Sequence, residues 1–289
     1  MIKVIASDLD GTLLNEHHML NQTTADAIKR AQAKGIRFMV ATGRAFKQVE
    51  ELMEAFDIRC DFLVSSGAEV RTPEKEIFYS GHMKMNSCKE VYDVLKEYSV
   101  PYLFNTAEAD YCIGTFEEMQ DKVLHHIFAF NQTVSLEEIK ESPAYKLMVE
   151  KTRVVSSFEE LEAENPKIIK IFIFTNELEI LAEIESKLTG NTNIAVASSF
   201  ANNLEITDVN AQKGPVLKAY IESLGYSMDE VMVFGDSMND YSMLSMDFGA
   251  TIAMDNADEK LKTVAKYVTK SNVEDGVAYT IDKLLEMQS

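Results

Sequence analysis

The stretch Ile2–Thr12, IKVIASDLDGT, decides the fold. Its apolar first half predicts a short buried strand that ends at Asp8. Gly11 permits a tight turn directly after this strand, because glycine adopts backbone conformations that other residues avoid. Two carboxylates, Asp8 and Asp10, can then face the crevice at the carboxyl end of the strand, where open α/β sheets bind their ligands. An Asx turn that only closes the strand is the alternative interpretation.

Strand and helix patterns alternate in the first and last thirds of the chain. We expect strands over residues 36–41, 62–65, 231–234, 251–253 and 267–269, and helices over 25–34, 46–56 and 275–287. Successive βα units of this kind predict an α/β fold, with a Rossmann-like parallel sheet and helices on both of its faces.

The middle of the chain has another order of elements. We expect helices over residues 86–98, 117–131 and 178–188, hairpins over 101–114 and 194–207, and a strand over 168–174. Residues 135–164 show no clear pattern. This order predicts an α+β cap domain inserted into the α/β core, with residues 1–83 and 207–289 as a discontinuous core and residues 84–206 as the cap.

Composition limits the partners and the location of the protein. The chain has 289 residues, with 28 Lys and Arg against 47 Asp and Glu, and a formal net charge of −19. Binding to nucleic acid through counterion release requires clustered basic residues, so we expect no nucleic-acid partner. No apolar run approaches the ~20 residues that span a bilayer, and the N-terminus lacks a signal-peptide cleavage site. We therefore expect a cytoplasmic protein without a membrane partner, as a monomer or a small homo-oligomer.

The three cysteines, Cys60, Cys88 and Cys112, do not form a CxxC pair. An odd number of scattered cysteines favours reduced, buried thiols over a disulfide or a zinc site.

Two short motifs could hold a phosphate group. The segment Thr42–Arg44, TGR, follows the predicted strand 36–41, and its hydroxyl and backbone amides can donate to a phosphate oxygen. A plain turn is the alternative. Lys213 precedes a glycine near a predicted helix start, where its charge can neutralise a transferring phosphoryl group, although most such lysines are solvated.

A third motif could hold a metal ion. The segment Gly235–Asp240, GDSMND, follows the predicted strand 231–234 and carries several oxygen-bearing side chains. Carboxylates and water are the ligands that a hard cation such as Mg²⁺ prefers. A helix N-cap made by Asp236 or Ser237 is the alternative.

Taken together, DxDGT, TGR, KG and GDxxND resemble, in order and spacing, the haloacid dehalogenase (HAD) superfamily of phosphatases and more narrowly its Cof-type subgroup. The resemblance covers nearly the whole chain, because residues 252–257, residues 274–278 and the length of the insert also look like that subgroup, including its class IIB cap.

The resemblance implies a Mg²⁺-dependent hydrolase of phosphomonoesters. Its partner would be a small phosphate ester, such as a sugar phosphate or a phosphorylated cofactor, and the reaction would pass through an aspartyl phosphate. A phosphomutase or phosphotransferase on the same scaffold and a non-catalytic phosphometabolite-binding protein remain open. A Rossmann oxidoreductase is disfavoured, since no GxGxxG follows the first strand.

The resemblance also implies a role for each motif residue. Asp8 would be the nucleophile, and Asp10 the general acid for the leaving oxygen and then the base that activates water. Mg²⁺ would be bound by the carboxylates of Asp8 and Asp236 and the backbone carbonyl of Asp10. Because Asp8 and Asp10 are like charges at close range, one of them should have a raised pKa unless metal relieves it. Asp10 would be left free to be protonated, as a general acid must be.

The remaining motif residues would bind the phosphoryl group or support the site. The expected phosphate-binding residues are Leu9 and Gly43 through their N–H groups, Thr42, Lys213 and Asn239. Asp240 would orient the metal or Lys213, and Arg44 would support the site.

Three positions depart from the subgroup pattern. Ser66 stands where Asn is usual, Gln212 precedes the lysine where a smaller residue is common, and Asp255 replaces a usual Gly. Of the three, Ser66 lies where a change would alter contacts near the substrate mouth.

Overall fold

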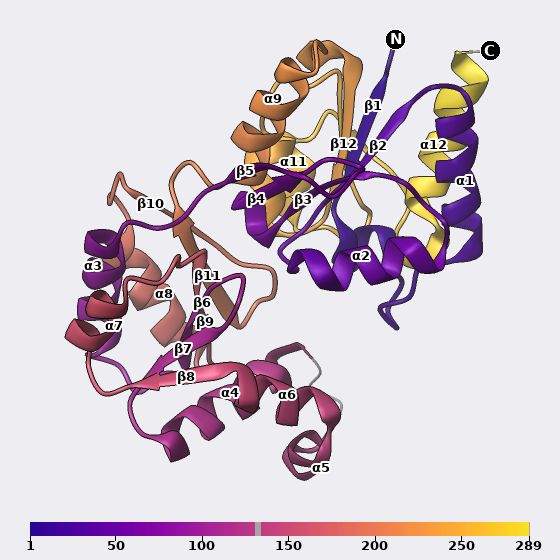
Figure 1. Ribbon diagram of the computed structural model, residues 1–289. Coiled ribbons are helices and arrows are strands. Elements are labelled where there is room, and N and C mark those ends of the chain that lie inside the picture. The colour runs from indigo at the N-terminus through magenta and orange to yellow at the C-terminus, as the bar shows by residue number, and fades with distance from the viewer. Residues whose placement is uncertain (131–133, 289) are drawn as a thin grey trace. The chain divides into compact units, whose positions relative to one another are not determined.

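The computed structural model describes residues 1–130 and 134–288 (Figure 1). The chain divides into two compact units, a core unit of Met1–Gly81 with Asn210–Ser289 and an inserted unit of His82–Val209. These boundaries differ by two and three residues from the ones predicted after residues 83 and 206. Within the described ranges, no helix combines the length and the apolar character needed to cross a bilayer.

The core unit is built on an eight-stranded sheet with the order β14-β13-β12-β1-β2-β3-β4-β5. Its strands are β1 (Val4–Ser7), β2 (Arg37–Ala41), β3 (Asp61–Val64), β4 (Glu69–Arg71), β5 (Ile77–Ser80), β12 (Val231–Gly235), β13 (Ala250–Ala253) and β14 (Tyr267–Val268). The strands from β14 to β3 pair in parallel, as the alternation of strands and helices predicted. β1 lies near the middle of the sheet, with β2 on one side and β12 on the other.

One edge of this sheet differs from the all-parallel expectation, because β4 and β5 are antiparallel to their neighbours. Only residues 65–68 join β3 to β4. A parallel pair needs a crossover of about a dozen residues or more. A connection of this length can therefore only join antiparallel strands.

The core helices lie on both faces of the sheet, as predicted. They are α1 (Gln22–Ala33), α2 (Phe46–Ala55), α9 (Lys213–Ser223), α10 (Tyr241–Leu244), α11 (Glu259–Val264) and α12 (Gly276–Met287). α1 and α12 pack against each other, and α9 lies on the opposite side of the central strands (Figure 1). Short helical turns over Leu9–Leu13, Ser65–Gly67, Met228–Glu230, Met238–Asp240 and Asn272–Glu274 complete the unit.

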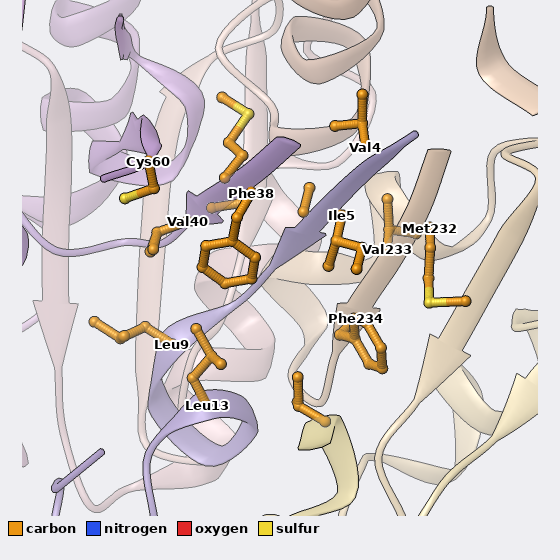
Figure 2. Close-up of a cluster of buried hydrophobic side chains, with 14 of the residues drawn as sticks. Val4, Ile5, Leu9, Leu13, Phe38, Val40, Cys60, Met232, Val233 and Phe234 are labelled. Carbon is orange, nitrogen blue, oxygen red and sulfur yellow. The ribbon is translucent and has the colours of Figure 1, made fainter. Parts of the chain in front are cut away.

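Buried side chains of the central strands form the middle of the core, including Ile5, Phe38 and Phe234 (Figure 2). Leu9 and Leu13, from the turn that follows β1, enter the same apolar cluster. Apolar burial of this kind fixes the turn from one side. The chain between the two leucines is therefore held at the edge of the sheet, and this segment carries Asp10.

The inserted unit is an α+β domain, as predicted. Its sheet has the order β10-β11-β9-β6-β7-β8, and all its pairs are antiparallel except β7 with β8. The strands are β6 (Tyr102–Asn105), β7 (Asp110–Ile113), β8 (Thr152–Val155), β9 (Lys170–Phe174), β10 (Ile194–Ala197) and β11 (Asn203–Asp208). β6 with β7 and β10 with β11 are the two predicted hairpins.

Helices cover both faces of this second sheet. They are α3 (Met85–Leu95), α4 (Phe116–Phe130), α5 (Leu136–Glu141), α6 (Pro143–Lys151), α7 (Phe158–Glu164) and α8 (Leu178–Leu188). Successive strand residues point to opposite faces, so Phe104 packs with α3, α7 and α8, whereas Leu103 packs with α4, α5 and α6. The predicted helix 117–131 ends at Asn131, which lies outside the described residues.

Cys60, Cys88 and Cys112 are all free and buried, as expected. Burial raises the pKa of the Cys60 thiol and raises that of Cys88 to about 12. Thiols with such pKa values stay protonated and are poor nucleophiles.

Candidate active site

The candidate site lies at the carboxyl edge of the three central core strands. Ser7, the last residue of β1, is in register with Val40 of β2 and with Phe234 of β12. Asp8 follows at once, and its N–H donates to the carbonyl of Phe234 at 3.0 Å. Thr42 and Asp236 each come two residues after the partners of Ser7. The sheet places β2 and β12 on opposite sides of β1, so the order of the strands reverses at β1. Open α/β sheets bind their ligands at the carboxyl ends of the strands beside such a reversal.

Lys213 joins two carboxylates at this edge. Its Nζ donates to Asp8 Oδ1 and to Asp240 Oδ1, at 2.6 Å each, and lies 3.5 Å from Asn239 Oδ1. The side chain is fully buried. Burial lowers the pKa of Lys213, but the charges of Asp240 and Asp8 outweigh this effect and raise it, so the ammonium keeps its proton. A solvated lysine, the alternative at this position, is therefore wrong.

Asp236 lies against the turn that follows β1. Its Oδ1 accepts a hydrogen bond from Thr12 Oγ1 at 2.8 Å, and its Oδ2 accepts one from Ser237 Oγ at 3.0 Å. A Cβ atom on Gly11 would lie 2.3 Å from Asp236 Oδ2, and Gly11 has a φ of +77°. Only glycine allows this turn and this close approach.

Asp240 folds back over its own loop. Its Oδ2 accepts the N–H groups of Asp236 and Ser237 at 3.0 and 3.2 Å, while its Oδ1 accepts from Lys213. Ser237 is the N-cap residue of the turn Met238–Asp240, and its hydroxyl donates to Asp236 Oδ2. The N-cap position considered for Ser237 is therefore present beside the contacts of Asp236 and Asp240. Of the two roles predicted for Asp240, its contacts favour orienting Lys213.

Negative charge exceeds positive charge in this cluster. Carboxylate oxygens of Asp8, Asp236 and Asp240 lie within 4.8 Å of one another, with Lys213 as the cation between them. Burial raises the pKa of Asp236 to about 7, and the charge of Asp240 adds to the rise. Burial and then Asp240 also raise the pKa of Asp8 well above its usual range, against the opposing effect of Lys213. The prediction that Asp10 would be the like-charged partner is wrong, because Asp240 and Asp236 have that effect.

The donor set fits a hard divalent cation. The potential ligand atoms that the described residues bring together here are carboxylate oxygens, which suits Mg²⁺. Asp8 Oδ2 accepts no hydrogen bond from any described residue. Asp8 and Asp236 could thus hold Mg²⁺, with the Asp10 carbonyl in the adjoining turn. The oxygens of Asp236 accept only from two neutral hydroxyls, whereas Asp240 is engaged by the Lys213 ammonium and by two backbone N–H groups.

Asp10 has its own partners. Arg44 donates from Nε to Oδ2 at 2.8 Å and from Nη2 to Oδ1 at 2.5 Å, and His18 Nδ1 lies 3.2 Å from Oδ1. Burial raises the pKa of Asp10, but the hydrogen bonds from His18 and Arg44 outweigh it and lower the pKa to about 2. Asp10 is therefore held by Arg44 and His18 in its ionised form, and its expected protonation as a general acid stays a prediction. Sequence reasoning missed His18, whose only signals were a titratable ring and a position eight residues after Asp10.

The remaining predicted residues lie around the same edge. Thr42 is buried, and its Oγ1 accepts the N–H of Arg44 at 3.2 Å. Leu9 places its side chain in the core, which leaves its backbone in the turn after Asp8, and Gly43 follows Thr42 in the chain. Their contacts with a phosphoryl group remain predictions, as does that of Asn239.

Ser66 lies beside this group, and its N–H donates to the carbonyl of Thr42 at 3.0 Å. Its φ of 60° and ψ of 25° are left-handed. Asn adopts this conformation more readily than most residues, which gives a physical reason for the Asn usual at this position.

Comparisons with known proteins agree with the motifs. Residues 5–281 match the family of haloacid dehalogenase-like hydrolases. Phosphatase YwpJ of Bacillus subtilis is 30% identical over 98% of this chain and 100% of its own length. The 5-amino-6-(5-phospho-D-ribitylamino)uracil phosphatase YwtE of the same organism is 28% identical over 99% of each chain. A solved haloacid dehalogenase-like hydrolase from B. subtilis is 30% identical, with a TM-score of 0.81 over 98% of this chain and 100% of that one. The chain therefore belongs to the family of haloacid dehalogenase-like hydrolases, as the order of its motifs predicted.

Proposed function

We propose that the protein is a Mg²⁺-dependent phosphatase that hydrolyses a small phosphorylated metabolite through an aspartyl phosphate at Asp8. The observation that carries this proposal is the fully buried Lys213, hydrogen-bonded to Asp8 and Asp240 beside Asp236. Buried charges cost several kcal/mol each in desolvation and are weak contributors to stability. A buried ionic cluster with excess negative charge at the ligand-binding edge of the sheet is better explained by function.

In the first step, a carboxylate oxygen of Asp8 forms a bond to phosphorus, and the bond from phosphorus to the leaving oxygen breaks. Asp10 gives a proton to the leaving oxygen, and the incoming phosphate favours the protonated form of Asp10 through like-charge repulsion. Lys213, Thr42 and nearby backbone N–H groups stabilise the charge on the phosphoryl oxygens.

In the second step, water attacks the phosphorus of the aspartyl phosphate. Asp10 accepts a proton from this water, the bond from phosphorus to Asp8 breaks, and inorganic phosphate leaves. The hydrogen bonds from Arg44 and His18 keep Asp10 ionised, so its carboxylate has no proton of its own and can accept this one. Mg²⁺ held by Asp8 and Asp236 would reduce the repulsion between the nucleophile and the phosphate ester.

The substrate class is a sugar phosphate or a phosphorylated cofactor. The name of the relative YwtE, a phosphatase for a phosphorylated ribitylamino compound, supports an ester of a polyol. We assign the choice of leaving group to the inserted unit, acting as a cap. The core residues named above are occupied with the phosphoryl group, the metal or each other, so they distinguish one ester from another poorly.

Replacing Asp8 by Asn tests the mechanism. The amide is a poor nucleophile and removes a charged metal ligand, so D8N should stay folded by circular dichroism and release no phosphate from any ester that the wild type cleaves. D255N, at an exposed position, is the matched control and should retain activity. The assay follows free phosphate across phosphorylated sugars and polyols. Activity of D8N within about tenfold of wild type, after deamidation is excluded, would refute the nucleophile, and an isomeric ester as product would indicate a mutase.

A further inference from the structure

The two oxygens of the Asp10 carboxylate have unequal surroundings. Oδ1 accepts hydrogen bonds from Arg44 Nη2 and from His18 Nδ1, whereas Oδ2 accepts only from Arg44 Nε. The ring nitrogen Nδ1 of His18 lies 3.2 Å from Oδ1, within hydrogen-bond distance. Among the described residues, these are the side chains that hydrogen-bond the Asp10 carboxylate.

A folded turn brings His18 to Asp10. The N–H of His18 donates to the carbonyl of Asn15 at 3.0 Å, and Asn15 Oδ1 accepts the N–H groups of His17 and Met19 at 2.9 and 3.1 Å. His18 itself has a φ of +56°, which is uncommon for a residue other than glycine. Asn272 Nδ2 donates to the carbonyl of Leu14 at 2.8 Å and anchors the start of this turn to the core.

Arg44 reaches Asp10 from a different strand end. Its N–H donates to Thr42 Oγ1, and its carbonyl accepts the N–H of Ser65 at 2.9 Å, so its backbone is fixed on both sides. The guanidinium binds both oxygens of Asp10 as a fork, a geometry that the single ammonium group of a lysine cannot reproduce.

We propose that Arg44 and His18 are positioning residues for Asp10, which anchor Oδ1 and present Oδ2 as the oxygen that exchanges the proton with the leaving group and with water. This inference rests on the proposed role of Asp10 as acid and base. Oδ2 has one hydrogen bond and therefore a lone pair available for a proton, whereas Oδ1 already accepts two. Without both partners, a carboxylate that is partly open to solvent would sample several rotamers, and proton transfer requires a fixed geometry.

Leaving-group dependence tests this proposal. Phenyl phosphate has a poor leaving group that needs a proton, whereas 2,4-dinitrophenyl phosphate loses its phenolate unassisted. The ratio kcat/KM reports the steps up to loss of the leaving group, so it isolates the acid role of Asp10. For phenyl phosphate, R44M should lower kcat/KM by about 10- to 100-fold, part of the ~10²–10⁴-fold that general acid–base catalysis contributes. For the dinitrophenyl ester, the loss should stay within about threefold.

Matched variants separate positioning from general damage. R44K keeps the charge without the fork and should restore part of the activity on phenyl phosphate. H18Q should show a smaller loss that is again larger for phenyl phosphate. H17Q should show no loss, because the His17 side chain is exposed and its ion pair is with Glu16. R37K weakens another bidentate ion pair, with Asp61, and should lower thermal stability while leaving the ratio between the two substrates unchanged.

The outcomes distinguish this inference from the proposed function. D10N should show the same selective loss as R44M, but larger. If D10N is selective while R44M and H18Q lose activity equally on both esters, or lose none, the positioning role is refuted and the acid role stands. If R44M raises KM on both esters alike, Arg44 binds the phosphate and the inference is also refuted. If D10N itself lacks selectivity, the acid role fails and the inference fails with it.

Discussion

Replacing Asp236 by Asn should stabilise the metal-free protein at pH 8. Burial, with Asp240 adding to it, raises the pKa of Asp236 from 3.8 to about 7. Between these values the folded protein holds the proton more tightly than the unfolded chain does. The stability of the metal-free wild type should therefore fall as the pH rises from about 4 to about 7 and stay low above that range. D236N removes this charge, and its amide can still hydrogen-bond the hydroxyls of Thr12 and Ser237.

The size of the effect follows from the pKa. Each pKa unit corresponds to about 1.4 kcal/mol, so the charged form of Asp236 costs on the order of 4 kcal/mol at pH 8 and less than half of that at pH 5. For a unit of this size, each kcal/mol moves Tm by about 2–4 °C, so the gain in Tm should be on the order of 10 °C at pH 8. The gain should largely vanish near pH 4, where Asp236 is protonated in the folded wild type.

Thermal unfolding of the two proteins in EDTA, between pH 4 and pH 8, measures this directly. D255N, in which an exposed carboxylate is neutralised, should unfold like the wild type throughout. Adding Mg²⁺ should raise the Tm of the wild type at pH 8 and leave that of D236N nearly unchanged, because a cation offsets the charge that the variant lacks. If D236N and the wild type had the same Tm at pH 8 in EDTA, the reasoning about excess negative charge would be wrong.

Three other predictions test the metal, the core and the inserted unit. Activity should be lost in EDTA and return with Mg²⁺, while Ca²⁺ should inhibit because its larger, looser coordination shell misplaces the nucleophile; full activity in a metal-free assay contradicts this. Y220F should lower the free energy of unfolding in urea by about 1–3 kcal/mol, since Tyr220 Oη donates to the buried Asp61 at 2.6 Å, and an unchanged midpoint would show that this bond contributes little. Exchanging the inserted unit for that of a relative with another substrate should transfer substrate preference and leave the need for Asp8 unchanged; a folded chimera with the original ranking would direct attention to Ser66 and the core loops.

The sequence predicted best where a long apolar pattern ends in polar residues. Asp8 and Asp236 each follow a buried strand, and the boundaries of α8 agree with the prediction residue for residue. The rule that parallel strands share their carboxyl ends then placed both aspartates at one edge of the sheet. Prediction was poorest over residues 135–164, which form α5, α6, β8 and α7, because elements of four to nine residues are too short to establish a period.

Other features depend on contacts that no local pattern encodes. The strand β5 has mostly exposed side chains, so it lacks the apolar run by which a core strand is recognised. The partners of Asp10 are similar, since nothing near residue 10 in the sequence indicates that Arg44 will reach it. We expected repulsion between Asp8 and Asp10 to raise the pKa of one of them. Burial, and then Asp240, which is far from Asp8 in the sequence, raise the pKa of Asp8 instead.

The residues that break local rules gather at the same place. Lys213 is the first residue of α9, where the helix dipole disfavours a cation, and its charge is buried. Asp8 and Asp240 are buried carboxylates, and Ser66 has a left-handed backbone. Each of these choices costs stability by itself. They compensate one another in part, because Lys213 offsets part of the charge of the aspartates and Ser66 supports Thr42, yet an excess of negative charge is left over. A binding site can keep an uncompensated charge when its ligand supplies the opposite charge. The excess negative charge that should destabilise the metal-free protein is therefore also the physical reason for the site to bind a cation together with a phosphate.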